Sequence, residues 1–140
     1  MGVTRLERFP DWQRQLKEYV RSEIGKPFAF GRVDGAMFTA GAVKVMTGVD
    51  LARGYRGYKT AQGGMRKIAA KGHKSLAGPF EVLPEISPFS AVAGDVVLIE
   101  GSDGDCLGIM HGNHVYGVSD PIGVCKVETS KIIRAFKVGK

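Results

Sequence analysis

After residue 94 the sequence consists of short apolar runs of β-strand type, separated by glycine or by Asp and Ser. These runs are DVVLIE, CLGIMHG, HVYGV, GVCKVE and IIRAFKV. Runs so short and so closely spaced are typical of antiparallel strands joined by hairpins. The glycine content, 20 of 140 residues, also indicates many turns and closely approaching backbones. The second half of the chain therefore predicts an antiparallel meander of about five strands over residues 94–138.

The first half carries helical periodicity instead. Over residues 11–24, apolar side chains recur at spacings of three and four, which predicts an amphipathic helix that Asp11 caps. A second helix is predicted to begin near Asp34 and to end at the Thr47–Gly48 pair. Because this second helix is small or apolar nearly all round, we expect it to be central and buried.

A third, weaker helix is predicted in KTAQGGMRKIAAKG, where Gly63 and Gly64 lower the helical propensity. The stretch SLAGPFEVL is expected to add a short helical turn. Helices followed by strands predict an α+β domain, with helices at about 10–83 packed on one side of the sheet at about 94–138. The sequence has no internal repeat and no long linker, so residues 1–140 are predicted to form one domain.

The sequence gives no reason to expect a targeting signal. The N-terminus, MGVTRLERFPDWQ, has no apolar run of the kind that a signal peptide needs, and no window approaches the roughly 20 apolar residues of a membrane span. The two cysteines, Cys106 and Cys125, are too few for a disulfide scaffold. One bridge between them stays open, but free thiols are favoured. We therefore expect synthesis in a cytoplasm without a signal peptide.

The formal charge of +6 and the pI near 9.5 leave nucleic acid open as a partner. However, the positive residues are scattered, and the densest group lacks the interleaved aromatic residues of a base-stacking surface. A solvated helix face is the favoured interpretation, and nucleic acid is disfavoured as a partner. The densest group comprises Arg66, Lys67, Lys71, His73 and Lys74.

Three motifs follow one another in a characteristic order. A P-F-x-x-G-x-x-D loop precedes the central helix, A-G-D-V-V marks the first strand, and L-G-I-x-x-G lies on the second strand. This order resembles the NlpC-type, papain-like cell-wall cysteine peptidases, and most closely a short branch encoded in the tail modules of phages and prophages. The resemblance runs from Trp12 to the final IIRAFKV run, and it implies a papain-like (NlpC-type) fold.

The resemblance also implies where a catalytic triad would lie. In this superfamily a cysteine opens the central helix, a histidine lies on the facing strand, and a polar group on the next strand orients the imidazole. The cysteine position corresponds to Gly35, the histidine position to Cys106, and the orienting position to Gly117 or Val118. None of these side chains can perform the corresponding role. The resemblance therefore implies a degenerate peptidase without catalytic residues.

Relocated chemistry is a disfavoured alternative. Cys106 is the only cysteine near the expected cleft, and nothing in the spacing requires His114 to approach it. Alternation along a strand places His111 on the opposite face from Cys106. A Ser/His/Asp site that uses Ser119 and Asp120 lacks a nucleophile elbow. A zinc site lacks standard ligand spacing; it would need Cys106, His111, His114 and Cys125.

These observations favour a non-enzymatic structural or docking component of a phage tail tip or baseplate, incorporated in the virion tail. Its expected partners are other tail or baseplate proteins, with no cofactor, metal or small-molecule substrate. The alternative is a peptidoglycan peptidase or amidase whose nucleophile is substituted or displaced. We expect the groove between the central helix and the sheet to bind a neighbouring chain. The candidate groove residues are Phe30, Asp34, Gly35, Met37, Cys106, His114 and Tyr116.

Overall fold

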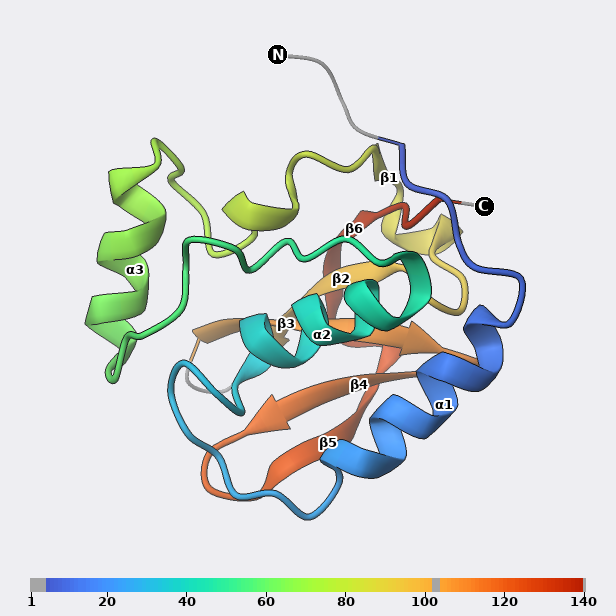
Figure 1. Cartoon of the computed structure of the whole chain (residues 1–140), viewed down its shortest axis with the longest axis horizontal. Helices are drawn as coiled ribbons and strands as arrows, with labels where there is room; N and C mark the ends of the chain where they lie inside the picture. Colours follow the sequence, from blue (N-terminus) through green and yellow to red (C-terminus); the bar gives the residue numbers. More distant parts are fainter. Residues whose placement is uncertain (1–4, 102–103, 140) are drawn as a thin grey trace.

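Three α-helices precede an antiparallel sheet of six strands in a computed structural model that describes residues 5–101 and 104–139. The predicted domain 1–140 also includes residues 1–4, 102–103 and 140, which lie outside the described residues. The predicted α+β class is confirmed. Helix α2 crosses one face of the sheet, α1 lies beside α2, and α3 stands apart from the strands (Figure 1).

The helices occur where the periodicity predicts them. They are α1 (Trp12–Glu23), α2 (Gly35–Thr47) and α3 (Ala61–Ala70), with short 3₁₀ turns η1 (Gly78–Phe80), η2 (Pro88–Ser90) and η3 (Thr129–Lys131). At the start of α2, the side chain of Asp34 accepts a hydrogen bond from the Met37 N–H at 2.8 Å. The predicted cap of α1 is wrong in one respect. Asp11 precedes that helix, but its carboxylate accepts from the side chains of Arg14 and Gln15 and not from the backbone.

The sheet differs from the predicted meander in its number of strands and in their order. Its strands are β1 (Glu85–Ile86), β2 (Val96–Gly101), β3 (Gly104–His111), β4 (His114–Ser119), β5 (Gly123–Glu128) and β6 (Ile132–Phe136). Strands β2 to β5 follow one another as predicted. The last strand does not pair with β5. It returns to β2, which gives the order β1-β6-β2-β3-β4-β5. The additional strand β1 has only two residues, too few for an alternating pattern to reveal it.

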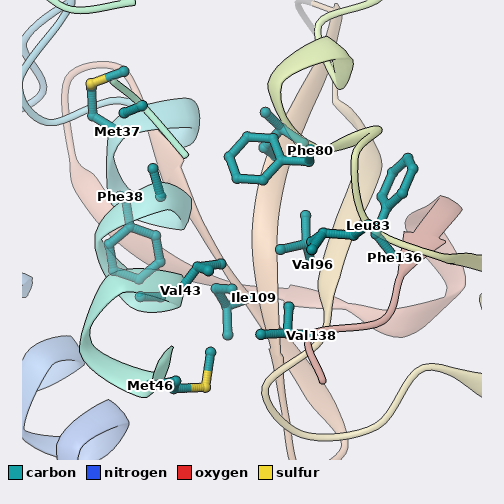
Figure 2. Packing of buried hydrophobic residues seen from close by; sticks show 14 of the residues in the cluster. Met37, Phe38, Val43, Met46, Phe80, Leu83, Val96, Ile109, Phe136 and Val138 are labelled. Carbon is teal, nitrogen blue, oxygen red and sulfur yellow. The ribbon is translucent and has the colours of Figure 1, made fainter. Parts of the chain in front are cut away.

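The main core lies between α2 and the sheet. Val43 and Met46 of α2 point toward the side of Ile109 on the central strands (Figure 2), and Phe38 and Val96 belong to the same cluster. All five side chains are at most 1% exposed, which makes this contact the principal apolar burial of the fold.

The opposite face of the sheet carries a second, smaller cluster. It comprises Val97, Ile99, Met110, Val115 and Ala135. Both faces of the central strands are therefore buried, which holds their backbones in place. No helix within the described ranges has the length and apolar character to cross a lipid bilayer.

Candidate functional site

A cavity of about 420 Å³ opens beside the start of α2. Its walls come from the loop before α2 and the first half of α2, from α3 and the connections on either side of it, from the start of β3 and from the end of β4. Most of the lining is apolar, and aromatic rings and methionine side chains contribute much of it. These residues are Phe28, Phe30, Met37, Tyr55, Tyr58, Met65 and Phe80. A concave, largely apolar site of this volume is typical of ligand-binding sites.

Gly35 lies where α2 meets β3, at the edge of the cavity. A Cβ atom at Gly35 would lie 3.0 Å from the Leu107 carbonyl oxygen and 3.2 Å from the Leu107 nitrogen. Such separations are shorter than a side chain normally tolerates, so the backbone of β3 occupies space next to the helix start. Glycine is the residue that permits this close approach.

The loop before α2 is organised by Asp34, which is only 6% exposed. Its Oδ1 accepts from the Met37 N–H, and its Oδ2 accepts from the Gly31 N–H at 2.8 Å and from the Tyr58 hydroxyl. Burial and the bond to this carboxylate raise the pKa of Tyr58. Both carboxylate oxygens are therefore engaged in holding the loop and Tyr58 in place.

Cys106 lies next to Gly35, as the resemblance implies for the facing strand. The Cβ atom of Cys106 would be 3.7 Å from a Cβ atom at Gly35. Its thiol is half-buried and free, and burial raises its pKa, with the nearby Cys125 and Asp105 adding to this effect. A raised pKa means less thiolate at neutral pH, the opposite of what an activated nucleophile requires.

The two candidates for the orienting position face different ways. Val118 lines the cavity together with Gly35 and Cys106. Gly117 faces the second cluster, where a Cβ atom would meet Ile99 Cδ1 at 3.3 Å. Neither position places a polar side chain beside Cys106.

Two residues of the expected groove, His114 and Tyr116, lie outside the cavity. Their rings form a cluster with His111 near the β3–β4 hairpin, with 4.9 Å between the centroids of His114 and Tyr116. His114 lines a separate, more open hollow with Lys126 and Glu128. The expected groove is therefore divided: Phe30, Asp34, Gly35, Met37 and Cys106 line the cavity, whereas the two residues of β4 do not.

The structure does not assemble the alternative catalytic or metal sites. Cys106 packs against the second cluster, whereas the rings of His111 and His114 lie near the hairpin, tilted at 47° to each other. The Ser119 hydroxyl contacts the Cys125 thiol at 3.3 Å, which supplies no general base. Over residues 5–101 and 104–139, no three His, Cys, Asp or Glu side chains lie close enough together to hold a metal ion.

Part of the basic stretch is engaged within the molecule. The Lys71 ammonium lies 5.3 Å from the centre of the Tyr55 ring, and His73 lies 3.8 Å from a Glu81 carboxylate oxygen. These contacts direct two of the five positive or titratable side chains toward the protein, so they are not all presented to solvent as one surface.

Sequence reasoning missed the outer wall of the cavity. Tyr55 and Tyr58 come from the connection before α3, and Phe80 comes from η1. These segments have no helical or strand period that could place them. One local signal was present, because Gly63 and Gly64 interrupt α3 where it faces Tyr58. A Cβ atom at Gly64 would lie 3.2 Å from the Tyr58 ring.

A sequence model of one protein family matches nearly the whole chain. It covers residues 7–138, and its description is a domain of unknown function (DUF6950). No curated protein matches the sequence.

Solved structures identify the fold. The NlpC/p60 domain of the peptidoglycan hydrolase SagA is 18% identical, with a TM-score of 0.60 over 89% of this chain and 97% of that domain. A protein similar to a lipoprotein, of the NLP/P60 family, from Staphylococcus aureus is 17% identical, with a TM-score of 0.59. The match to this second protein covers all of the present chain but only 45% of the staphylococcal one. The predicted NlpC-type fold is confirmed.

Proposed function

We propose that this chain, which belongs to the family described as a domain of unknown function (DUF6950), is a non-enzymatic docking protein built on a peptidoglycan-hydrolase-like scaffold. The cavity beside α2 is its binding site. We propose further that it is synthesised in a host cytoplasm and is incorporated in a phage tail tip or baseplate. Its partners there are other tail proteins.

The observation that carries this proposal is the contact between α2 and β3 at Gly35. A hydrolase of this architecture needs a thiolate at that helix start, because the free N–H groups and the helix dipole stabilise the anion there. Here Leu107 approaches to within 3.0 Å of the point that a Cβ atom would occupy. The neighbouring thiol, Cys106, has a raised pKa, and the three histidines are not among the residues described as lining the cavity.

The phage assignment has a different basis from the loss of catalysis. It depends on the order of sequence motifs that resembles the tail-module branch. A protein that has lost its catalytic side chains but keeps a rigid, buried framework can serve as a structural component.

The competing function is that of a cell-wall peptidase or amidase. It requires the rest of the catalytic machinery to be intact, so that restoring one thiol would restore hydrolysis. The Gly35→Cys variant therefore separates the two functions. We expect it to leave peptidoglycan undigested, because neither Cys106 nor Val118 can activate or orient a nucleophile. We also expect it to lose about 1 kcal/mol of stability through crowding against Leu107.

The measurement is release of soluble fragments from purified peptidoglycan, with an active NlpC/p60 domain as the positive control. Circular dichroism of the variant verifies that it is folded. Fragment release by folded Gly35→Cys protein would refute the docking proposal. The location is tested by mass spectrometry of purified virions, in which cross-links between this chain and tail proteins are expected.

A further inference from the structure

We infer that the cavity beside α2 binds an apolar side chain of a partner polypeptide that carries a lysine or arginine next to it. This inference rests on the proposed docking function and adds the chemistry of the partner. It follows from the shape of the cavity, from the charges at its rim and from the apolar surface beside its mouth.

The apolar part of the site is partly open to solvent. Phe30 is 36% exposed and Met65 is 41% exposed, although both line the cavity. The rings of Phe28 and Phe30 pack edge to face, with their centroids 4.7 Å apart, which fixes one side of the entrance. Buried aromatic walls that continue into exposed apolar side chains are typical of pockets that receive an anchoring side chain.

Another exposed apolar residue follows a segment that contacts the entrance through its backbone. The Phe28 N–H donates a hydrogen bond to the Pro121 carbonyl at 3.3 Å, and the next residue along the chain, Ile122, is 70% exposed. A lone small molecule would cover only the cavity. A polypeptide segment is long enough to contact Ile122 as well as the cavity.

The charges at the rim of the cavity determine which sign of charge the partner carries. Asp105 and Asp120 both line the cavity and are exposed, and neither forms an ion pair among the described residues. The lining, as far as the structure describes it, contains no lysine or arginine. The rim is therefore locally acidic, although the whole chain carries a net charge of +6.

An acidic rim favours a cation and opposes an anion. Fatty acids carry a carboxylate, and so do the stem peptides of peptidoglycan, and such a group would face Asp105 and Asp120 without a compensating cation. A segment with an aromatic or aliphatic anchor beside Lys or Arg satisfies both parts of the site. Asp34 does not share in this recognition, because both of its oxygens already accept hydrogen bonds within the protein.

Four compounds test this inference with the full chain labelled with ¹⁵N. They are the peptides acetyl-Ala-Lys-Phe-Lys-Ala-amide, acetyl-Ala-Glu-Phe-Glu-Ala-amide and acetyl-Ala-Lys-Ala-Lys-Ala-amide, together with dodecanoate. We expect the Lys-Phe-Lys peptide to shift amide resonances around the cavity. We expect it to bind at least about tenfold more tightly than each of the other three compounds.

Two pairs of variants localise the binding. Ala61→Trp places a large side chain at the cavity from an exposed position on α3, and Ala69→Trp is its matched control on the same helix, at an exposed position outside the lining. The double variant Asp105→Asn, Asp120→Asn removes the rim charge, and Glu100→Gln is its control. We expect Ala61→Trp and the double variant to weaken binding of the Lys-Phe-Lys peptide, and both controls to leave it unchanged.

Several results would overturn the inference. One is no binding of the Lys-Phe-Lys peptide at millimolar concentration. Another is equal or tighter binding of the Glu-Phe-Glu peptide, the Lys-Ala-Lys peptide or dodecanoate. A third is unaltered binding of the Lys-Phe-Lys peptide to Ala61→Trp or to the Asp105→Asn, Asp120→Asn variant. Failure here is distinct from failure of the docking proposal. Hydrolysis by Gly35→Cys would refute the docking proposal whatever the peptides do, whereas failed peptide binding without hydrolysis would remove only the partner chemistry.

Discussion

Cys106 has its Cβ atom close to the start of α2, but its thiol lacks the features that would make it reactive. A thiolate is favoured by an adjacent cation, by a metal or by direct contact with free helix N–H groups. Cys106 instead packs against the apolar second cluster, where burial raises the pKa of its thiol and the neighbouring Cys125 thiol adds to this effect. Its environment is that of a structural cysteine.

We therefore predict slow alkylation of Cys106. In the native protein at pH 8, its reaction with iodoacetamide should be several-fold slower than in the denatured chain, because the raised pKa lowers the thiolate fraction and burial limits access. Peptide mapping by mass spectrometry follows the modification at each cysteine separately. Native Cys106 that reacts faster than the denatured residue would show that the site activates it, and would favour the enzymatic alternative.

The residues beside Cys106 illustrate what the sequence could predict of the site. The motif order placed Gly35 and Cys106 on facing elements, and the structure brings their Cβ positions to 3.7 Å. The sequence could not place Tyr55, Tyr58 or Phe80 at the cavity, because long irregular connections have no period that relates them to α2. For the same reason, the sequence predicted a groove between α2 and the sheet but not the wall that α3 and its connections add to the cavity.

Among the elements, α1 and α2 pack through a contact that depends on one glycine. The Tyr19 ring stacks on Phe38, with centroids 5.5 Å apart, and its hydroxyl donates to the Phe38 carbonyl at 2.8 Å. This position of the ring requires the absence of a side chain at Gly41, where a Cβ atom would lie 2.7 Å from Tyr19 Cζ. Periodicity predicted both helices, but it could not identify which small residue receives the ring.

This contact predicts that the effect of Gly41→Ala on stability changes sign when the Tyr19 side chain is removed. Gly41→Ala should destabilise the protein by about 1–3 kcal/mol, because the new methyl group overlaps Tyr19. In a Tyr19→Ala background the overlap is gone, and the same substitution should stabilise by up to about 1 kcal/mol through the higher helix propensity of alanine. Urea unfolding of the four proteins measures the coupling. Destabilisation by Gly41→Ala of similar size in both backgrounds would place the strain elsewhere.

The order of the strands in the sheet could be predicted only in part from local sequence patterns. Strands β2 to β5 are joined by short connections, so their pairing follows from their order in the sequence. The pairing of β6 with β2 is a contact between segments far apart in the sequence. It depends on side chains such as Phe136, which is 1% exposed and belongs to the main core. Neither this pairing nor the two-residue β1 leaves a local pattern.

At the scale of the whole molecule, a buried ion pair joins the N-terminal segment to the turn before β2. Arg8 Nη2 lies 3.2 Å from Asp95 Oδ1, and their side chains are 5% and 0% exposed. Arg8 also donates to the Val138 carbonyl at 2.6 Å and to the Ala93 carbonyl at 3.0 Å. The N-terminal segment is thereby fixed to the end of the chain after β6, on the side of the molecule away from α3 (Figure 1).

The Asp95 carboxylate also accepts from the backbone N–H groups of Val92 and Val138, and it lies 3.4 Å from the Lys137 ammonium. These bonds hold the turn before β2 against the C-terminal segment. Because α2 packs on the strands that this turn begins, the framework of the cavity depends on a contact remote from it. We therefore expect that a change at this contact lowers the stability of the scaffold without changing the affinity of the cavity.

The Arg8→Ala variant tests whether stability and binding are independent. Arg8→Ala should destabilise the protein by about 3 kcal/mol, because it leaves the buried Asp95 carboxylate with only the more exposed Lys137 as a cation. Arg14→Ala is the matched control, since Arg14 is 63% exposed and its ion pairs with Asp11 and Glu18 contribute at most about 1 kcal/mol. Urea unfolding measures both. Equal losses of stability in Arg8→Ala and Arg14→Ala would mean that the Arg8–Asp95 pair does not hold the scaffold together. Below the unfolding transition, Arg8→Ala should still bind the Lys-Phe-Lys peptide with the affinity of the parent protein, because the pair lies outside the cavity lining.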